Sequence, residues 1–139
     1  MKYIKANDTY AVRLDPGEDI VESVIKLARD ESIAFAEISA IGAANDVTFG
    51  LYDLNEKKYH SITLSEPLEL VSLNGNLSHK DGEPYLHLHA AFANEEGAIF
   101  GGHLNRAIIS ATCEMFIRTL PAEMSRRISE ETGLNIFDI

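Results

Sequence analysis

The segment from residue 85 to residue 92 alternates between two kinds of side chain, and this pattern constrains the fold more than any other in the chain. Every second position is apolar: Leu86, Leu88, Ala90 and Phe92. The intervening positions carry Tyr85, His87, His89 and Ala91. Because residues i and i+2 of a β-strand lie on the same face, the pattern predicts a strand with its apolar face in the core. It places His87 and His89 side by side on the other face.

Most of the remaining sequence also has the composition of strands separated by turn residues. We expect further strands at residues 10–14, 33–54, 57–64, 68–77, 98–100 and 107–120. Gly42 and Gly50 are expected to be bulges or turns within the second of these. The dipeptide Asp81-Gly82 predicts a tight hairpin before the histidine strand.

One helix is predicted, after the turn residues Asp15-Pro16-Gly17, with Glu18 or Asp19 at its start. Its apolar residues recur at helical spacing: Ile20, Val24, Leu27 and Ala28. The polar tail after Pro121 suggests one more helical turn around residues 122–128. Together these elements predict an α+β fold, a mostly antiparallel sheet with one main helix packed on it, as a single domain over residues 1–139.

Composition limits the cellular setting and the partners. The 139 residues include 12 Lys and Arg against 22 Asp and Glu, a net charge of −10. The densest basic cluster is Arg126-Arg127, so autonomous DNA binding is disfavoured. A lone cysteine, Cys113, excludes an internal disulfide and fits a reducing cytoplasm. No apolar run approaches the roughly 20 residues that span a bilayer, so we expect a soluble cytoplasmic protein without a membrane partner.

A third histidine follows the pair, in Gly101-Gly102-His103. If a glycine turn brings His103 to His87 and His89, three imidazoles form a zinc site with one open position. In the alternative interpretation the histidines are ordinary polar residues on the outer face of a sheet. The two glycines then only let packed elements approach closely. His60 and His79 are weaker candidates for ligands.

Three other residues have two interpretations each. Arg13 forms a buried or subunit-interface ion pair with Glu114 or Glu69, or it faces outward from its strand. Glu69 is either a surface charge or a partner contact. Cys113 is expected to be a buried structural thiol rather than a nucleophile, because no activating group is near it in the sequence.

The combined motifs resemble the plants-and-prokaryotes-conserved (PPC) domain family, formerly a domain of unknown function. The matching residues are Leu73-Asn74-Gly75-Asn76-Leu77-Ser78, the run 80–89, Gly101-Gly102-His103-Leu104 and Ala111-Thr112-Cys113-Glu114. The resemblance to prokaryotic single-domain members implies a homotrimer with a metal, zinc, at His87, His89 and His103. It also carries a DNA-binding label, although the Arg-Gly-Arg-Pro segment of the plant relatives is absent here.

Three functions remain open from the sequence. The first is a trimeric metal-binding module whose open coordination position takes a small anion or metabolite. The second is a metal-dependent hydrolase or lyase acting on a small molecule, with Glu83 or Glu114 as general base. The third is a DNA-associated regulator that acts through an oligomeric surface or a partner protein.

Overall fold

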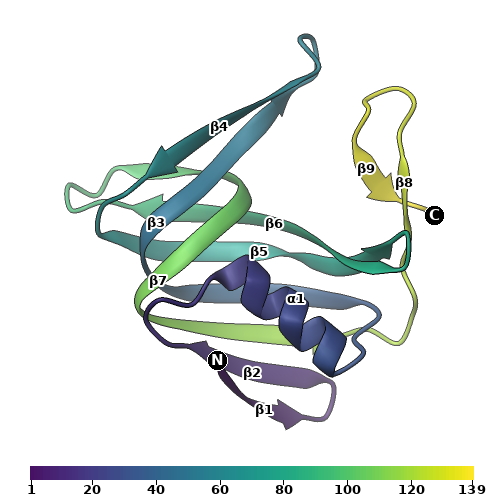
Figure 1. Ribbon diagram of the computed structural model, residues 1–139, viewed down its shortest axis with the longest axis horizontal. Helices are drawn as coiled ribbons and strands as arrows, with labels where there is room; N and C mark the ends of the chain where they lie inside the picture. The colour runs from purple at the N-terminus through teal and green to yellow at the C-terminus, as the bar shows by residue number, and fades with distance from the viewer.

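The alternating segments form a strongly curved antiparallel sheet with one helix against it. The computed structural model describes the whole chain, Met1–Ile139 (Figure 1). Its elements are β1 (Lys2–Ala6), β2 (Thr9–Leu14), α1 (Ile20–Asp30), β3 (Ala36–Asp53), β4 (Lys58–Leu64), β5 (Leu68–Lys80), β6 (Glu83–Ala93), β7 (Ile99–Thr119), β8 (Arg126–Ile128) and β9 (Asn135–Phe137). The expected α+β class is confirmed.

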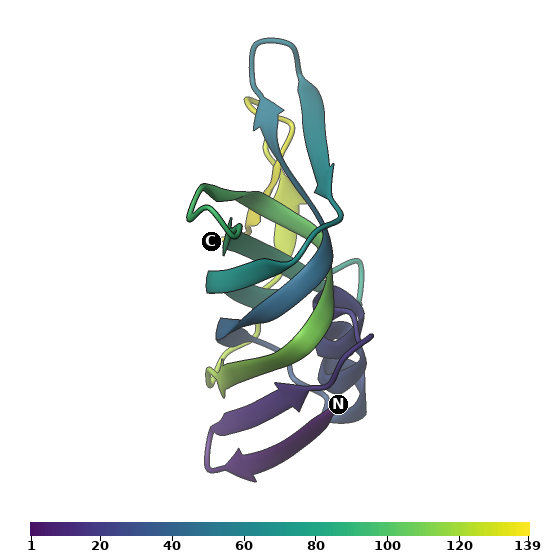
Figure 2. The ribbon, with the colours of Figure 1, turned by 90° about the vertical axis from the view of Figure 1, so that its left-hand side faces the viewer.

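Seven strands form one sheet in the order β1-β2-β7-β6-β5-β3-β4, with antiparallel neighbours. The long strand β7 also pairs with β3, so β3, β5, β6 and β7 make a closed circuit of pairings. The end-on view in Figure 2 shows the resulting curvature, with α1 on one side of the sheet. The β3–β4 hairpin and the short β8–β9 hairpin both extend from the same end of the molecule (Figures 1 and 2).

Helix α1 begins where the sequence predicts. Asp19 is the N-cap, and its carboxylate accepts a hydrogen bond from the Glu22 N–H at 2.8 Å. The apolar stripe Ile20, Val24, Leu27 and Ala28 is buried, and the helix packs on β6 and β7. This helix is short and amphipathic, and the structure has no helix that could cross a membrane.

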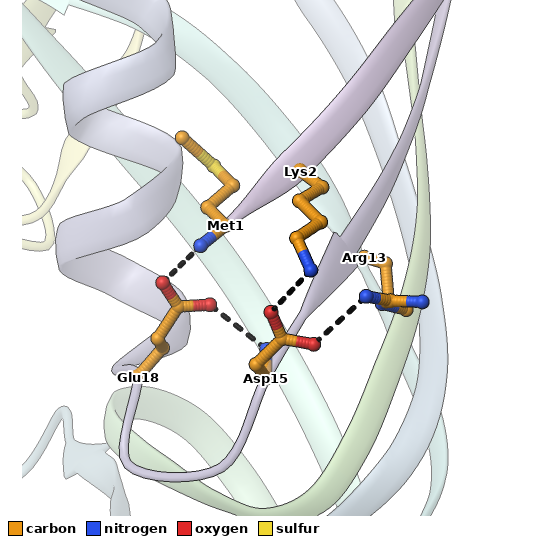
Figure 3. Close-up of polar contacts among 5 residues, drawn as sticks. All are labelled: Met1, Lys2, Arg13, Asp15 and Glu18. Carbon is orange, nitrogen blue, oxygen red and sulfur yellow. Dashed lines mark hydrogen bonds and ion pairs between the residues drawn. The ribbon is translucent and has the colours of Figure 1, made fainter.

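Ion pairs fasten the turn between β2 and α1 to the N-terminal strand (Figure 3). Asp15 pairs with Lys2 at 3.6 Å and with Arg13 at 3.1 Å. Glu18 accepts hydrogen bonds from the Met1 amino group and from the Asp15 N–H, which lower the pKa of its carboxyl. Within the chain, Arg13 pairs with neither Glu114 nor Glu69: it lies beside Glu114 in the strand register, but its half-exposed guanidinium faces outward and contacts Asp15, in line with the second interpretation.

Two of the expected turns are confirmed. Asp81 and Gly82 have φ values of 53° and 84°, which is the left-handed backbone of a tight hairpin. The register of β3 shifts on both sides of Gly42, as expected for a bulge. An alanine Cβ at Gly42 would lie 2.3 Å from the Thr112 carbonyl oxygen, so close strand approach requires glycine there.

Two expectations about the second half of the chain are wrong. The segments 98–100 and 107–120 are parts of one strand, β7, and Gly101-Gly102 lies inside it rather than in a turn. The tail contains no helical turn at residues 122–128 and instead forms the β8–β9 hairpin. Both errors arise because pairing with distant strands, rather than local sequence, decides these conformations.

We predict that Asp19 stabilises more than the helix start. One carboxylate oxygen caps α1, and the other accepts the buried N–H of Ala107 in β7 at 3.2 Å. Asp19→Ala should lower the free energy of unfolding by about 2–4 kcal/mol, because it removes a cap and leaves a buried N–H unpaired. Urea denaturation measures this. Asp19→Ser keeps the capping oxygen and should lose about half as much; equal losses for the two variants would contradict the double role.

Candidate metal centre

The pairing of β6 with β7 brings the three histidines together. His89 lies directly opposite His103 in the strand register, and His87 lies two residues from His89 on the same face of β6. The ring centroids are 5.2 Å apart for His87 and His89, 5.4 Å for His87 and His103, and 5.7 Å for His89 and His103. The structure therefore brings together the three side chains that were expected to lie close to one another.

Glycines make this convergence possible by allowing backbones to touch. A Cβ on Gly101 would lie 2.2 Å from the Ala90 carbonyl oxygen of β6. A Cβ on Gly102 would lie 2.5 Å from the Gly50 carbonyl oxygen of β3. Both distances are too short for real contacts, so β7 can lie between β6 and β3 only with glycine at these positions. The glycine pair therefore allows neighbouring strands to pack closely and does not form a turn.

The donor set fits a transition metal such as zinc. One ring nitrogen from each of His87, His89 and His103 lies within 4.8 Å of the others. Zinc–imidazole bonds are about 2.0–2.1 Å long, so small side-chain rotations allow one ion to reach all three. No protein group forms a hydrogen bond with any of these ring nitrogens. Three partly exposed imidazoles without protein partners are a ready ligand set.

The surroundings hold two of these rings in the neutral form. Burial, and after it the charges of His103, Arg126 and His89, lower the pKa of His87 to about 4. Burial, and then the charge of His89, also lowers the pKa of His103. Neutral imidazole is the form that ligates metals, so the site is prepared for a cation at neutral pH.

A cavity of about 510 Å³ opens beside the three histidines. Its other walls come from β3, β4, β6 and β7 and from the C-terminal segment: Gly50, Leu51, Tyr52, Tyr59, Tyr85, Gly102, Gly133, Leu134, Asn135 and Ile136. The Tyr59 hydroxyl lies 2.6 Å from the Asn105 side-chain oxygen and 3.2 Å from the His103 carbonyl. These contacts hold β7 in position where His103 projects.

Arg126 is the residue near this site whose role the sequence did not reveal. It lies in the Arg126-Arg127 pair, but its side chain is buried. The guanidinium donates to Ser78 Oγ at 2.7 Å, to Asn76 Oδ1 at 2.7 Å and to the Asn135 carbonyl at 3.0 Å. It also lies over the rings of Tyr85 and Phe137. Arg126 thus joins the C-terminal hairpin to β5 and β6.

The weaker histidine candidates lie outside the cluster. His60 is exposed and 3.3 Å from Glu56, and the His79 ring is 3.0 Å from the Ala34 carbonyl. Cys113 is buried, as expected, and burial raises the pKa of its thiol to about 12. It therefore has the character of a structural thiol.

The two candidate bases also lie elsewhere. Glu83 is exposed and pairs with Arg29 at 2.9 Å. Glu114 and Glu69 line a separate hollow on the outer sheet face. No carboxylate lines the histidine cavity.

Comparison with known proteins identifies the family. The model of the Plants and Prokaryotes Conserved (PCC) domain, the family also abbreviated PPC, matches residues 1–121. The chain belongs to this family. The PCC match ends before the β8–β9 hairpin, so one wall of the histidine cavity comes from outside the matched residues.

Solved structures resemble this PCC domain over nearly its whole length. A "putative DNA-binding protein" from Bacteroides thetaiotaomicron is 28% identical with a TM-score of 0.95, covering 99% of this chain and 96% of that one. A metal-containing protein from Archaeoglobus fulgidus is 37% identical with a TM-score of 0.89, covering 96% and 94%. Among curated proteins, the bifunctional protein GlmU of Synechococcus sp. (strain JA-3-3Ab) is 35% identical over 127 residues. That match covers 89% of this chain but only 19% of GlmU.

We predict that His87 of the metal-free protein titrates far below an ordinary histidine. Its pKa of about 4, against 6.5 for the unperturbed group, means that the unfolded chain binds more protons between these values. The free energy of unfolding should therefore fall as the pH falls from 6.5 to 4. NMR titration of the imidazole protons, with urea denaturation at each pH, measures both effects.

His87→Gln should weaken this dependence, because it removes the histidine whose pKa is lowered to about 4 in the folded state. A His87 midpoint near 6.5 would contradict the burial argument.

Proposed function

We propose that this PCC domain is a homotrimeric zinc-binding protein in which His87, His89 and His103 hold one metal ion per chain and leave one coordination position open to a small anion or metabolite. The observation that carries the proposal is the convergence of three imidazoles that have no protein partners. The lowered pKa values of His87 and His103 support it. The metal-containing relative from Archaeoglobus fulgidus adds independent support.

Each residue of the site has a definite task in this function. The three imidazoles supply neutral nitrogen ligands, and β6 and β7 fix their spacing. Tyr59 holds the backbone of β7 beside His103. When bound, the zinc ion supplies Lewis-acid chemistry at its open position. The cavity beside it restricts which molecules can reach that position.

The alternative, a metal-dependent hydrolase or lyase, requires a general base near the open position. The carboxylates considered for this task, Glu83 and Glu114, lie outside the histidine cavity. Its titratable groups other than the histidines are the hydroxyls of Tyr52, Tyr59 and Tyr85. The absence of a carboxylate favours ligand binding over hydrolysis through a Glu base.

Direct DNA binding is not the function that the charges favour. The chain carries a net charge of −10. Five of its six arginines pair with carboxylates: Arg13, Arg29, Arg106, Arg118 and Arg127. The sixth, Arg126, is buried. Affinity for nucleic acid depends on cations that are free to contact phosphates, and arginine supplies none here.

An apolar patch on the outer face of the sheet supports self-association. Ile41 and Phe116 are 59% exposed and Val71 is 50% exposed. Ile41 and Val71 line a hollow of about 540 Å³ that also contains Thr112. The Thr112 hydroxyl is buried and has no hydrogen-bond partner within the chain. A second copy of the chain would cover the apolar side chains and could satisfy this hydroxyl.

Metal content is the first test of this function. Purified protein should contain about one zinc ion per chain by elemental analysis. His87→Ala and His103→Ala each remove a ligand and should weaken binding by at least about tenfold, since loss of even an outer partner costs that much. His60→Ala should retain the metal. Metal content that neither His87→Ala nor His103→Ala changes would exclude this site.

The oligomer is tested separately by light scattering after size-exclusion chromatography. The native mass should be three times the 15.4 kDa of one chain. Phe116→Glu places a charge in the apolar patch and should shift the protein to a smaller species. Ile128→Glu, at an equally exposed residue of the separate β8–β9 sheet, is the matched control. A native protein that elutes as a monomer would exclude the trimer.

A further inference from the structure

The histidine cavity is unusual in an acidic protein because no charged side chain other than the histidines lines it. Its walls are backbone glycines, three tyrosines, an asparagine and the apolar residues Leu51, Leu134 and Ile136. A divalent ion held by three neutral imidazoles would keep its whole charge of +2, because no carboxylate ligand offsets any of it. The cavity would therefore attract an anion.

Arg126 increases this positive potential. It is the one arginine of six without a carboxylate partner, and its three hydrogen-bond acceptors are the neutral groups of Ser78, Asn76 and Asn135. Its guanidinium lies over the ring of Tyr85, which lines the cavity two residues from His87. A buried guanidinium without a carboxylate partner would repel a metal ion bound nearby. An anion bound between them would reduce this repulsion.

The cavity also offers hydrogen-bond donors. The Tyr85 hydroxyl accepts a hydrogen bond from the Asn135 side-chain N–H at 3.2 Å, and no protein group accepts the proton of that hydroxyl. Tyr52, which lines the cavity from β3, makes no side-chain hydrogen bond within the protein. Each hydroxyl can donate one bond to an anionic oxygen.

The apolar wall indicates what is attached to the anionic group. Leu51 and Leu134 are large, exposed hydrophobic residues that line the cavity from β3 and from the C-terminal hairpin. A ligand with a hydrocarbon body would cover both. Inorganic phosphate fits less well, because it needs many N–H donors around its oxygens and the cavity has no lysine or arginine in its lining.

From these observations we propose that the cavity binds a small organic monocarboxylate, with its carboxylate at the metal and the Tyr85 hydroxyl and its hydrocarbon body against Leu51, Leu134 and Ile136. The proposal rests on the metal-binding function above. In this proposal the β8–β9 hairpin contacts the hydrocarbon part of the ligand and so determines which carboxylates bind. Arg126 is then a positioning residue, because it attaches the hairpin to β5 through Ser78 and Asn76.

The experiment uses protein stripped with a chelator and reloaded with Co²⁺, whose visible absorption reports on its ligands. Acetate, butyrate, benzoate and inorganic phosphate are titrated separately. We expect saturable spectral changes with the carboxylates and a rise in affinity of up to about fourfold for each added methylene. Phosphate should bind more weakly than butyrate.

Two variants assign the contacts. Tyr85→Phe removes only a hydroxyl and should weaken acetate and butyrate alike by about two- to tenfold, with Co²⁺ uptake unchanged. Leu134→Ser should reduce the preference for butyrate over acetate, whereas Leu54→Ser, at an exposed leucine of the β3–β4 turn, should not.

The possible failures are distinct. If Co²⁺ gives no bands, both the metal site and the carboxylate proposal are wrong. Bands that carboxylates leave unchanged would retain the metal site and overturn the ligand assignment. Phosphate binding tighter than butyrate, or an unchanged preference in Leu134→Ser, would overturn the proposed apolar specificity.

Discussion

The close approach of the β3, β6 and β7 backbones at Gly101 and Gly102 is the constraint on which the histidine cluster depends. His103 faces His89 on one side and Gly50 on the other, so a single strand position is fixed from two directions. Any side chain at the two glycines would collide with a carbonyl oxygen of a neighbouring strand. The spacing of the imidazoles therefore comes from rigid strand pairing rather than from a flexible loop, and little reorganisation is needed when a ligand binds.

Features set by local physics could be predicted from the sequence. The cap at Asp19, the buried stripe of α1 and the left-handed backbone of Asp81 and Gly82 each depend on a few neighbouring residues. The common face of His87 and His89 follows from the period of a strand. For the same reason, two of the three ligands of the candidate site were predictable without any tertiary information. The third, His103, was a candidate because of the glycine pair before it, and the family resemblance supported that choice.

Features set by distant contacts could not be predicted in the same way. The continuity of β7 through Gly101 and Gly102 depends on neighbours supplied by β3 and β6, which the local sequence does not contain. The sequence suggests that Arg126 belongs to an exposed basic cluster. In the structure, Tyr85 and Phe137 cover its guanidinium from separate strands. The β8–β9 hairpin has only three residues in each strand, too few for a periodic signal.

The distribution of charge on this PCC domain disfavours nucleic acid and favours a small anion as a partner. Its exposed arginines are engaged with carboxylates, which leaves a net negative surface that would repel the phosphates of nucleic acid. Arg126 is the one arginine without a carboxylate partner, and it is buried beside the three histidines rather than exposed on the surface. In the proposed function, a partly exposed metal centre next to a buried arginine would attract an anion small enough to enter the cavity and apolar enough to match its walls. The same geometry that disfavours a polyanion thus favours a compact organic acid.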